Sequence, residues 1–107
     1  MQQITPTDLA AWLRDPSRSQ PVLIDVREDW EFELCHIEGA ASLPLGQIAN
    51  QYGDLDPTAH TVVICHHGIR SMHAADFLEE RGFTAIFNLV GGVAAWAEEV
   101  DPNMRRY

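Results

Sequence analysis

The chain runs Val62-Val63-Ile64-Cys65-His66-His67-Gly68-Ile69-Arg70-Ser71 and then continues as an amphipathic segment up to Gly82. The apolar run predicts a buried strand and the segment after Ser71 predicts a helix, so Cys65 would lie at the carboxyl tip of the strand. Backbone N–H groups at a helix N-terminus are free to bind anions, and the helix dipole favours negative charge there. The same field favours a thiolate over a thiol, which makes Cys65 a candidate nucleophile.

Short apolar runs alternate with amphipathic segments along the rest of the chain. We expect strands at residues 22–24, 41–43, 61–64 and 85–89, and helices at residues 6–15, 28–34, 45–52, 71–81 and 93–100. This alternation predicts a three-layer α/β fold with a mainly parallel central sheet of about five strands flanked by helices. In such sheets ligands bind outside the carboxyl ends of the strands, where Asp25 and Cys65 would both lie.

The bulk composition describes an ordinary globular chain of 107 residues, 46% apolar and 21% charged. It is long enough to bury a core, and without repeats or linkers it is expected to form one domain over residues 1–107. The net charge of −9 argues against nucleic acid or an anionic membrane as partner, and no apolar run suits a membrane helix. Two cysteines and no signal-peptide pattern lead us to expect a soluble, cytoplasmic protein.

Four segments carry further signals. They are Leu23-Ile24-Asp25-Val26-Arg27-Glu28, His36-Ile37-Glu38-Gly39-Ala40, Cys65 to Ser71, and Asn88-Leu89-Val90-Gly91-Gly92 with Trp96. In this order and spacing, over nearly the whole chain, they resemble the motifs of the rhodanese family, and specifically of its single-domain, thiosulfate sulfurtransferase-like members. The resemblance implies a rhodanese-like fold and a sulfurtransferase activity.

By this resemblance, Cys65 would take a sulfane sulfur from a small anionic donor such as thiosulfate and form a persulfide. The acceptor would be cyanide, a thiol or a protein thiol, and no cofactor or metal is implied. The loop residues would bind the substrate, and these are His66, His67, Gly68, Ile69 and Arg70. Main-chain N–H groups of the loop would hold the anionic persulfide, and Gly68 permits the positive φ that such a turn requires.

Supporting roles are expected for Asp25, Arg27 and Ser71 around the loop. Asp25 and Arg27 are interpreted as a structural pair that ties the strand to the loop. Arg70 would either hold the oxyanion of the donor or brace the loop, because its guanidinium offers a planar fork of donors.

The length of the loop distinguishes sulfur chemistry from phosphate chemistry. Four residues separate Cys65 from Arg70, whereas the related cysteine-dependent phosphatases and arsenate reductases have five there and a wider cradle. By that family rule the shorter loop encloses sulfur. A cysteine-dependent phosphatase or arsenate reductase nevertheless stays an alternative, as does a persulfide carrier or interaction module that serves a partner protein.

Several side chains have two open interpretations. His66 and His67 either contact the substrate or point to solvent, and Cys35 is either a resolving thiol or a bystander. The tail, residues 101–107, either anchors a partner or lies on the surface. The cysteines and histidines match no standard zinc spacing, so no metal site is predicted. Packing in the core or at its rim is expected for Trp12, Trp30 and Trp96.

Overall fold

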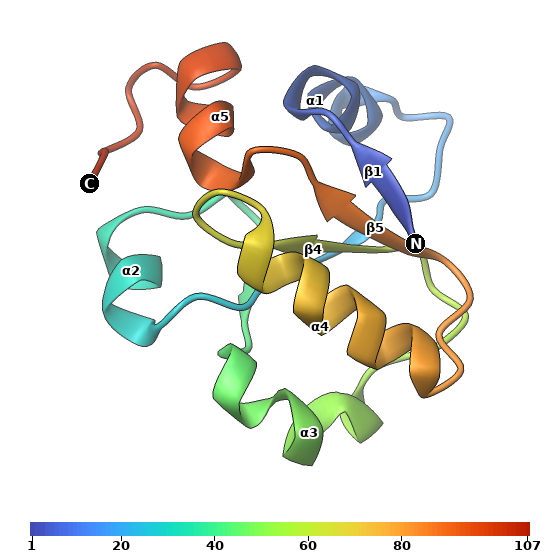
Figure 1. Ribbon diagram of the computed structural model, residues 1–107. Helices are drawn as coiled ribbons and strands as arrows, with labels where there is room; N and C mark the ends of the chain where they lie inside the picture. Colours follow the sequence, from blue (N-terminus) through green and yellow to red (C-terminus); the bar gives the residue numbers. More distant parts are fainter.

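Five parallel strands form the centre of the structure, a computed structural model that describes all of residues 1–107 (Figure 1). The strands are β1 (Gln2–Ile4), β2 (Val22–Asp25), β3 (Ala41–Ser42), β4 (Thr61–Ile64) and β5 (Ile86–Leu89). Their order across the sheet is β1-β5-β4-β2-β3, and every neighbouring pair is parallel. The predicted α/β architecture with a parallel central sheet is therefore confirmed.

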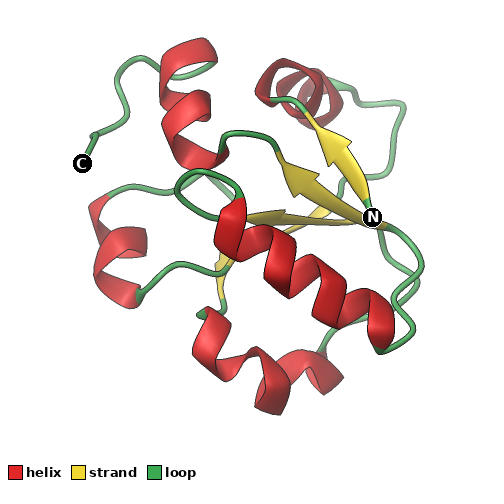
Figure 2. Ribbon diagram, viewed as in Figure 1, coloured by secondary structure: helices red, strands yellow, loops and turns green.

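Helices cover both faces of the sheet (Figure 2). They are α1 (Pro6–Arg14), α2 (Asp29–Leu34), the 3-10 turn η1 (Leu45–Gln47), α3 (Ile48–Gln51), the 3-10 turn η2 (Tyr52–Asp54), α4 (Ile69–Glu80) and α5 (Gly92–Glu99). Leu9 of α1 and Trp96 of α5 belong to one buried apolar cluster, and Ile48 of α3 and Leu78 of α4 belong to a second. These clusters are the cores on the two sides of the sheet. No helix is both long and apolar enough to cross a lipid bilayer.

The central strand β4 determines where the thiol points. Its residues are fully buried, and they alternate between the two cores: Val62 and Ile64 pack with α1 and α5, while Val63 and Cys65 pack with α4. Because successive side chains of a strand point to opposite faces, the thiol of Cys65 lies on the α4 side of the sheet. Asp25 of β2 pairs in register with Ile64, so Arg27 and Cys65 emerge at the same edge.

The structure corrects the sequence prediction at three points. Strand β1 was not predicted, because three residues at an exposed sheet edge carry almost no periodic signal. Helix α4 begins at Ile69 rather than Ser71, directly after Gly68, which adopts a left-handed conformation with φ of 101°. The single helix predicted for residues 45–52 is instead a series of three short turns, η1, α3 and η2.

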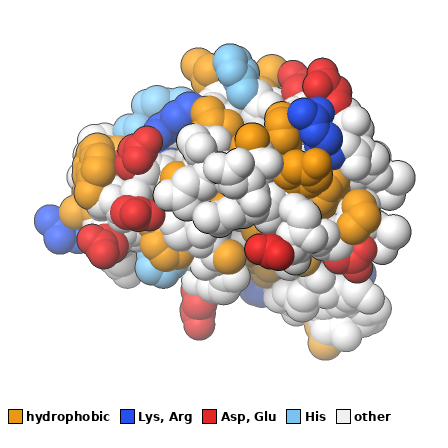
Figure 3. Space-filling view, turned by 90° about the horizontal axis from the view of Figure 1, so that it is seen from below, with side chains coloured by type: hydrophobic (Ala, Val, Ile, Leu, Met, Phe, Trp, Pro, Cys, Tyr) orange, Lys and Arg blue, Asp and Glu red, His pale blue; other side chains and the backbone are white.

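Charged side chains are distributed rather than clustered on the face that Figure 3 displays. Acidic, apolar and basic side chains are interspersed there among uncharged ones. This face therefore offers no extended positive surface to a polyanion, in keeping with the net charge of −9.

Candidate active site

Cys65 is a buried thiol with two polar contacts to its sulfur. The backbone N–H of Gly68 donates a hydrogen bond to Sγ at 3.0 Å, and the hydroxyl of Ser71 lies 3.3 Å from Sγ. The residue is 1% exposed. The sulfur thus faces the turn and the first residues of α4, where backbone N–H groups and the helix dipole favour negative charge.

The N-terminus of α5 binds two backbone carbonyls of the loop. The carbonyl of Cys65 accepts from Val93 N at 2.9 Å, and the carbonyl of His66 accepts from Ala94 N at 3.1 Å. In a trans peptide the N–H points opposite to the C=O, so these bonds turn the next two amides of the loop away from α5 and toward its interior. The loop therefore presents several amides on the side of the thiol.

Gly92 makes this contact between α5 and the loop possible. A Cβ at this position would lie 2.2 Å from the carbonyl oxygen of Cys65 and 2.4 Å from that of His66, and its φ is +58°. Any larger residue would have to push α5 away from the loop. The glycine pair of the C-terminal motif thus shapes the site through the loop backbone.

The side chain of Asn88, on β5, links the turn at Gly68 to Ser71 of α4. Its Oδ1 accepts from the hydroxyl of Ser71, and its Nδ2 donates to the carbonyl of Gly68 at 3.3 Å and to Gln3 Oε1 at 2.9 Å. The side chain is 2% exposed. Sequence reasoning quoted Asn88 within a motif but gave it no role, although an amide inside a buried strand is itself a signal of a required hydrogen bond.

Asp25 and Arg27 form the expected ion pair beneath the loop. Arg27 Nη2 lies 2.7 Å from Asp25 Oδ2, and both side chains are fully buried. Arg27 also donates to the carbonyl of Cys35 at 2.6 Å and to the Tyr107 hydroxyl at 2.9 Å. Burial alone would lower the pKa of Arg27, but the hydrogen bonds to Asp25 and Tyr107 outweigh it and hold this pKa above its usual value. Arg27 is therefore a permanently charged junction of β2, α2 and the tail.

Arg70 pairs with a carboxylate of α2. Its Nη1 and Nη2 lie 2.7 and 2.9 Å from the two carboxylate oxygens of Glu31, a bidentate pair. The hydrogen bond from Arg70 is the main reason that the pKa of Glu31 falls to about 2. The pair ties the first turn of α4 to α2, which is the contact that the bracing role requires, and the role of Arg70 in holding a donor oxyanion stays a prediction. Sequence reasoning missed Glu31, because no local pattern links α2 to the loop 39 residues away.

The two loop histidines and Tyr107 form a stack of rings over the loop. The ring centroid of His66 lies 4.0 Å from that of His67 on one side and 4.0 Å from that of Tyr107 on the other. Burial lowers the pKa of His66, and the neighbouring His67 lowers it further. Desolvation raises the pKa of Tyr107 to about 12. The tail therefore folds back onto the loop, a contact that the sequence did not predict.

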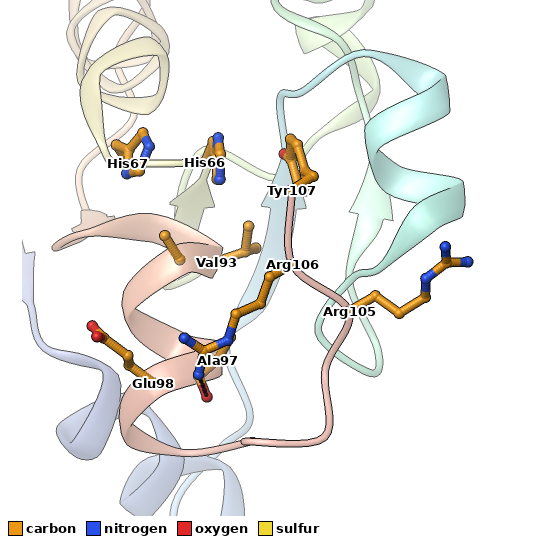
Figure 4. Close-up of a pocket in the computed structure, with 9 residues that line it drawn as sticks. His66, His67, Val93, Ala97, Glu98, Arg105, Arg106 and Tyr107 are labelled. Atoms are coloured by element: carbon orange, nitrogen blue, oxygen red, sulfur yellow. Dashed lines mark hydrogen bonds between the residues drawn. The ribbon is translucent and has the colours of Figure 1, made fainter.

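A cleft of about 220 Å³ lies beside this stack, between the loop, α5 and the tail (Figure 4). His66, His67 and Tyr107 form its upper wall, while Val93 and Ala97 of α5 lie beneath them. Cys65 does not line this cleft.

The remaining predicted site residues lie around the loop. Ile69 is 68% exposed at the rim. Cys35 is a half-buried free thiol whose sulfur lies 3.9 Å from Arg27 Nη1. No three His, Cys, Asp or Glu side chains converge as metal ligands would. Trp12 and Trp96 are buried, whereas Trp30 lies at the rim with its ring against Tyr107.

Comparison with known proteins identifies the family and supports the fold. Residues 5–99 match the rhodanese-like domain family. The chain belongs to this family. The resemblance that the four motifs carry is thereby confirmed.

Relatives of this rhodanese-like chain are named for sulfur transfer. It is 40% identical over 76 residues to the thiosulfate sulfurtransferase GlpE of Shewanella oneidensis, which covers 71% of this chain and 75% of the relative. It is 36% identical over 106 residues to the probable adenylyltransferase/sulfurtransferase MoeZ of Mycobacterium tuberculosis, covering 97% of this chain and 26% of that protein. The chain thus spans about a quarter of the length of MoeZ, and it spans 38% of a rhodanese-like/PpiC domain protein of Arabidopsis thaliana.

Solved structures support the same assignment. A rhodanese-like domain protein from Staphylococcus aureus superposes with a TM-score of 0.84 at 27% identity, covering 94% of this chain and 95% of that one. A protein from Staphylococcus saprophyticus gives 0.83 at 28% identity over 94% and 97% of the two chains.

Proposed function

We propose that this rhodanese-like chain is a sulfurtransferase that moves a sulfane sulfur from thiosulfate or a similar donor to a thiophilic acceptor through a persulfide on Cys65. The observation that carries the proposal is the position of Sγ, which accepts a hydrogen bond from the Gly68 amide at the start of α4. A sulfur held in this way is aimed into the loop, where backbone N–H groups can bind a thiolate or a persulfide anion. The names of the relatives support sulfur transfer as the type of reaction.

The reaction balances without a cofactor. The thiolate of Cys65 attacks the outer sulfur of thiosulfate, a new S–S bond forms, and the S–S bond of the donor breaks as sulfite leaves with the electron pair. Cyanide or a thiolate then attacks the outer sulfur of the persulfide, the bond to Cys65 breaks, and the thiolate is regenerated. The side chain of Cys65 is therefore an anion before and after each step, as a thiolate or as a persulfide.

The backbone of the loop can stabilise both of these anions. The amide of Gly68 already contacts the sulfur, and the two preceding amides face the interior because their neighbouring carbonyls bind α5. Fixed N–H donors stabilise the persulfide anion with little reorganisation. The Arg70–Glu31 pair holds the first turn of α4 in place, so the donors keep their orientation between steps.

The proposal is tested by turnover with thiosulfate and cyanide, read as thiocyanate formation. Cys65→Ser should abolish turnover, whereas Cys35→Ser, the matched control, should retain it. An aryl phosphate and arsenate serve as the rival substrates. Cys65-dependent turnover of either rival, with none of thiosulfate, would establish the phosphatase or reductase alternative instead.

One observation favours a protein thiol as the acceptor. Cys65 is 1% exposed, while large apolar side chains stand exposed nearby on α2 and on the first turn of α4: Trp30, Ile69 and Met72. Exposed apolar groups around a buried reactive atom suit a protein partner better than a small ion. The persulfidated protein can be incubated with excess small thiol and, separately, with a protein thiol. Retention of the sulfur in the first mixture and its transfer in the second would support the carrier role.

A further inference from the structure

The hydroxyl of Ser71 lies between the sulfur of Cys65 and the side-chain amide of Asn88. Ser71 Oγ is 3.3 Å from Cys65 Sγ, and it also contacts Asn88 Oδ1. The three residues are buried, with exposed fractions of 1% for Cys65, 0% for Ser71 and 2% for Asn88. Because buried polar groups are paired in folded proteins, the hydrogen atoms along this row can be assigned one by one.

The orientation of the Asn88 amide is assigned from the groups around it. Asn88 Nδ2 lies 3.3 Å from the carbonyl oxygen of Gly68 and 2.9 Å from Gln3 Oε1. The opposite orientation would place Asn88 Oδ1 against the Gly68 carbonyl, so that two acceptors would face each other. Oδ1 therefore faces Ser71, and since a carbonyl oxygen can only accept, the Ser71 hydroxyl is the donor of this hydrogen bond.

The hydroxyl of Ser71 has a single hydrogen, and this hydrogen is the one donated to Asn88. The contact between Ser71 Oγ and Cys65 Sγ is then a hydrogen bond only if the sulfur donates, as an S–H group. The N–H of Gly68 donates to the same sulfur at 3.0 Å. A neutral thiol thus satisfies every polar atom of the row, whereas a thiolate would face a lone pair of the Ser71 oxygen.

A thiolate avoids this conflict when the Ser71 hydroxyl rotates. The rotation moves the hydroxyl hydrogen from Asn88 Oδ1 to Cys65 Sγ, while the proton of the thiol passes to a buffer base in solution. The sulfur then accepts from both Gly68 and Ser71, but the buried Oδ1 of Asn88 is left without a donor, which is unfavourable. Asn88 and the thiolate of Cys65 therefore compete for one hydrogen.

We propose that Asn88 is a positioning residue that controls the ionisation of Cys65 through the hydroxyl of Ser71. When the hydroxyl hydrogen is on Asn88, Cys65 is held as a thiol, and when it is on the sulfur, Cys65 is a thiolate. Asn88 itself makes no hydrogen bond to the sulfur. The use of this control in sulfur transfer rests on the proposed function, but the exchange of the hydrogen needs no sulfur donor.

Charged groups also act on the sulfur, and they are the same in the parent and in every variant used below. On α4, Arg70 interacts electrostatically with Cys65 and is paired with Glu31 of α2. Strand β5 and the first turn of α5 bring no charged side chain to the loop. Four further titratable side chains lie around the loop, and these are Asp25 and Arg27 of β2 and His66 and His67 of the loop itself. A difference between variants therefore reports on Ser71 and Asn88.

The first test is the pH dependence of the alkylation of Cys65 by iodoacetamide, which requires no donor or acceptor of sulfur. In a Cys35→Ser background Cys65 is the single thiol. The rate follows the thiolate fraction, so the midpoint of the pH profile does not depend on how easily the reagent reaches the sulfur. Asn88→Ala frees the Ser71 hydrogen for the sulfur. The midpoint should fall by about one pH unit, which is a tenfold change in the ratio of thiolate to thiol.

Repeating the substitution without the hydroxyl separates control through Ser71 from a general loosening of the site. In a Ser71→Ala background, Asn88→Ala should leave the midpoint unchanged, because no hydroxyl remains to carry its effect. Gln3→Ala is the matched control, since it removes a partner of Asn88 Nδ2 but leaves Oδ1 on Ser71, and the parent midpoint should be retained. The proposal is overturned if Asn88→Ala lowers the midpoint equally in both backgrounds, if it lowers it in neither, or if Gln3→Ala lowers it as much.

A second measurement leaves Asn88 intact, so it decides the question even if Asn88→Ala does not fold. The infrared S–H stretching band of Cys65, recorded below the midpoint, reports whether the thiol donates a hydrogen bond. In the Cys35→Ser protein the band should lie at a lower frequency than in Cys35→Ser with Ser71→Ala, where the acceptor is missing. Equal frequencies would overturn the assignment of the Ser71 hydrogen to Asn88. A protein that behaves as expected in these tests but does not turn over thiosulfate would refute the proposed function and leave this inference standing.

Discussion

The contact between α5 and the Cys65 loop makes a specific prediction about Gly92→Ala. The added Cβ would lie 2.2 Å from the carbonyl oxygen of Cys65 and 2.4 Å from that of His66, both backbone atoms. No side-chain rotation can relieve such an overlap, because Cβ is fixed to the backbone. The first turn of α5 must therefore move away from the loop.

The cost follows from the contacts that this movement removes. The bonds from Val93 N and Ala94 N to the loop carbonyls are 2.9 and 3.1 Å long, and each contributes about 1 kcal/mol. A non-glycine residue at a φ of +58° costs about 1 kcal/mol more. We expect Gly92→Ala to lower the free energy of unfolding by about 3 kcal/mol, which is a large share of the stability of a small domain.

The matched control is Gly82→Ala. Gly82 also has a positive φ, +92°, but an added Cβ would meet no atom within 4 Å. This substitution isolates the conformational cost, about 1 kcal/mol. Urea unfolding followed by tryptophan fluorescence measures both variants. If Gly92→Ala costs no more than Gly82→Ala, the close approach of α5 does not shape the loop and our account of its amides is wrong.

Three other substitutions probe the site through the free energy of unfolding in urea. Pairing with Arg70 lowers the pKa of Glu31 to about 2. The contribution of the ionised pair to the free energy of unfolding is therefore complete above about pH 5 and is lost as the pH falls toward 2. Glu31→Gln should thus cost about 2 kcal/mol at pH 7 and much less near pH 2; a constant difference would contradict the pairing. Ser71→Ala removes a contact to Cys65 and leaves a buried oxygen of Asn88 unpaired, for a loss of about 1–3 kcal/mol, and no loss would refute the link. Asn88→Asp sets an anionic oxygen against the carbonyl of Gly68 and should cost about 3 kcal/mol at pH 7, whereas a neutral outcome would exclude the buried amide bridge.

The parts of the structure that depend on neighbouring residues were predictable from the sequence. The apolar run before Cys65 and the amphipathic segment after it fix a strand, a turn and a helix, and together they place the thiol at a helix start. The Asp25–Arg27 pair was also expected, since two residues separated by one position at a strand end remain close in any fold of this class.

The parts that depend on distant residues were not predictable. Glu31 reaches Arg70 across 39 positions, and Tyr107 reaches Glu31 across 76. Such contacts depend on how α2 and the tail pack against the loop, which no local periodicity encodes. The same reason explains Asn88, whose partners lie on α4, on the loop and at the start of the chain.

The most direct measurement of the central claim is the intact mass of the reduced chain after incubation with thiosulfate. We predict the gain of one sulfur atom, removable by cyanide, in the parent and in Cys35→Ser, and no gain in folded Cys65→Ser. An unchanged mass in the parent, or a sulfur atom that is still added when Cys65 is replaced, would contradict the account.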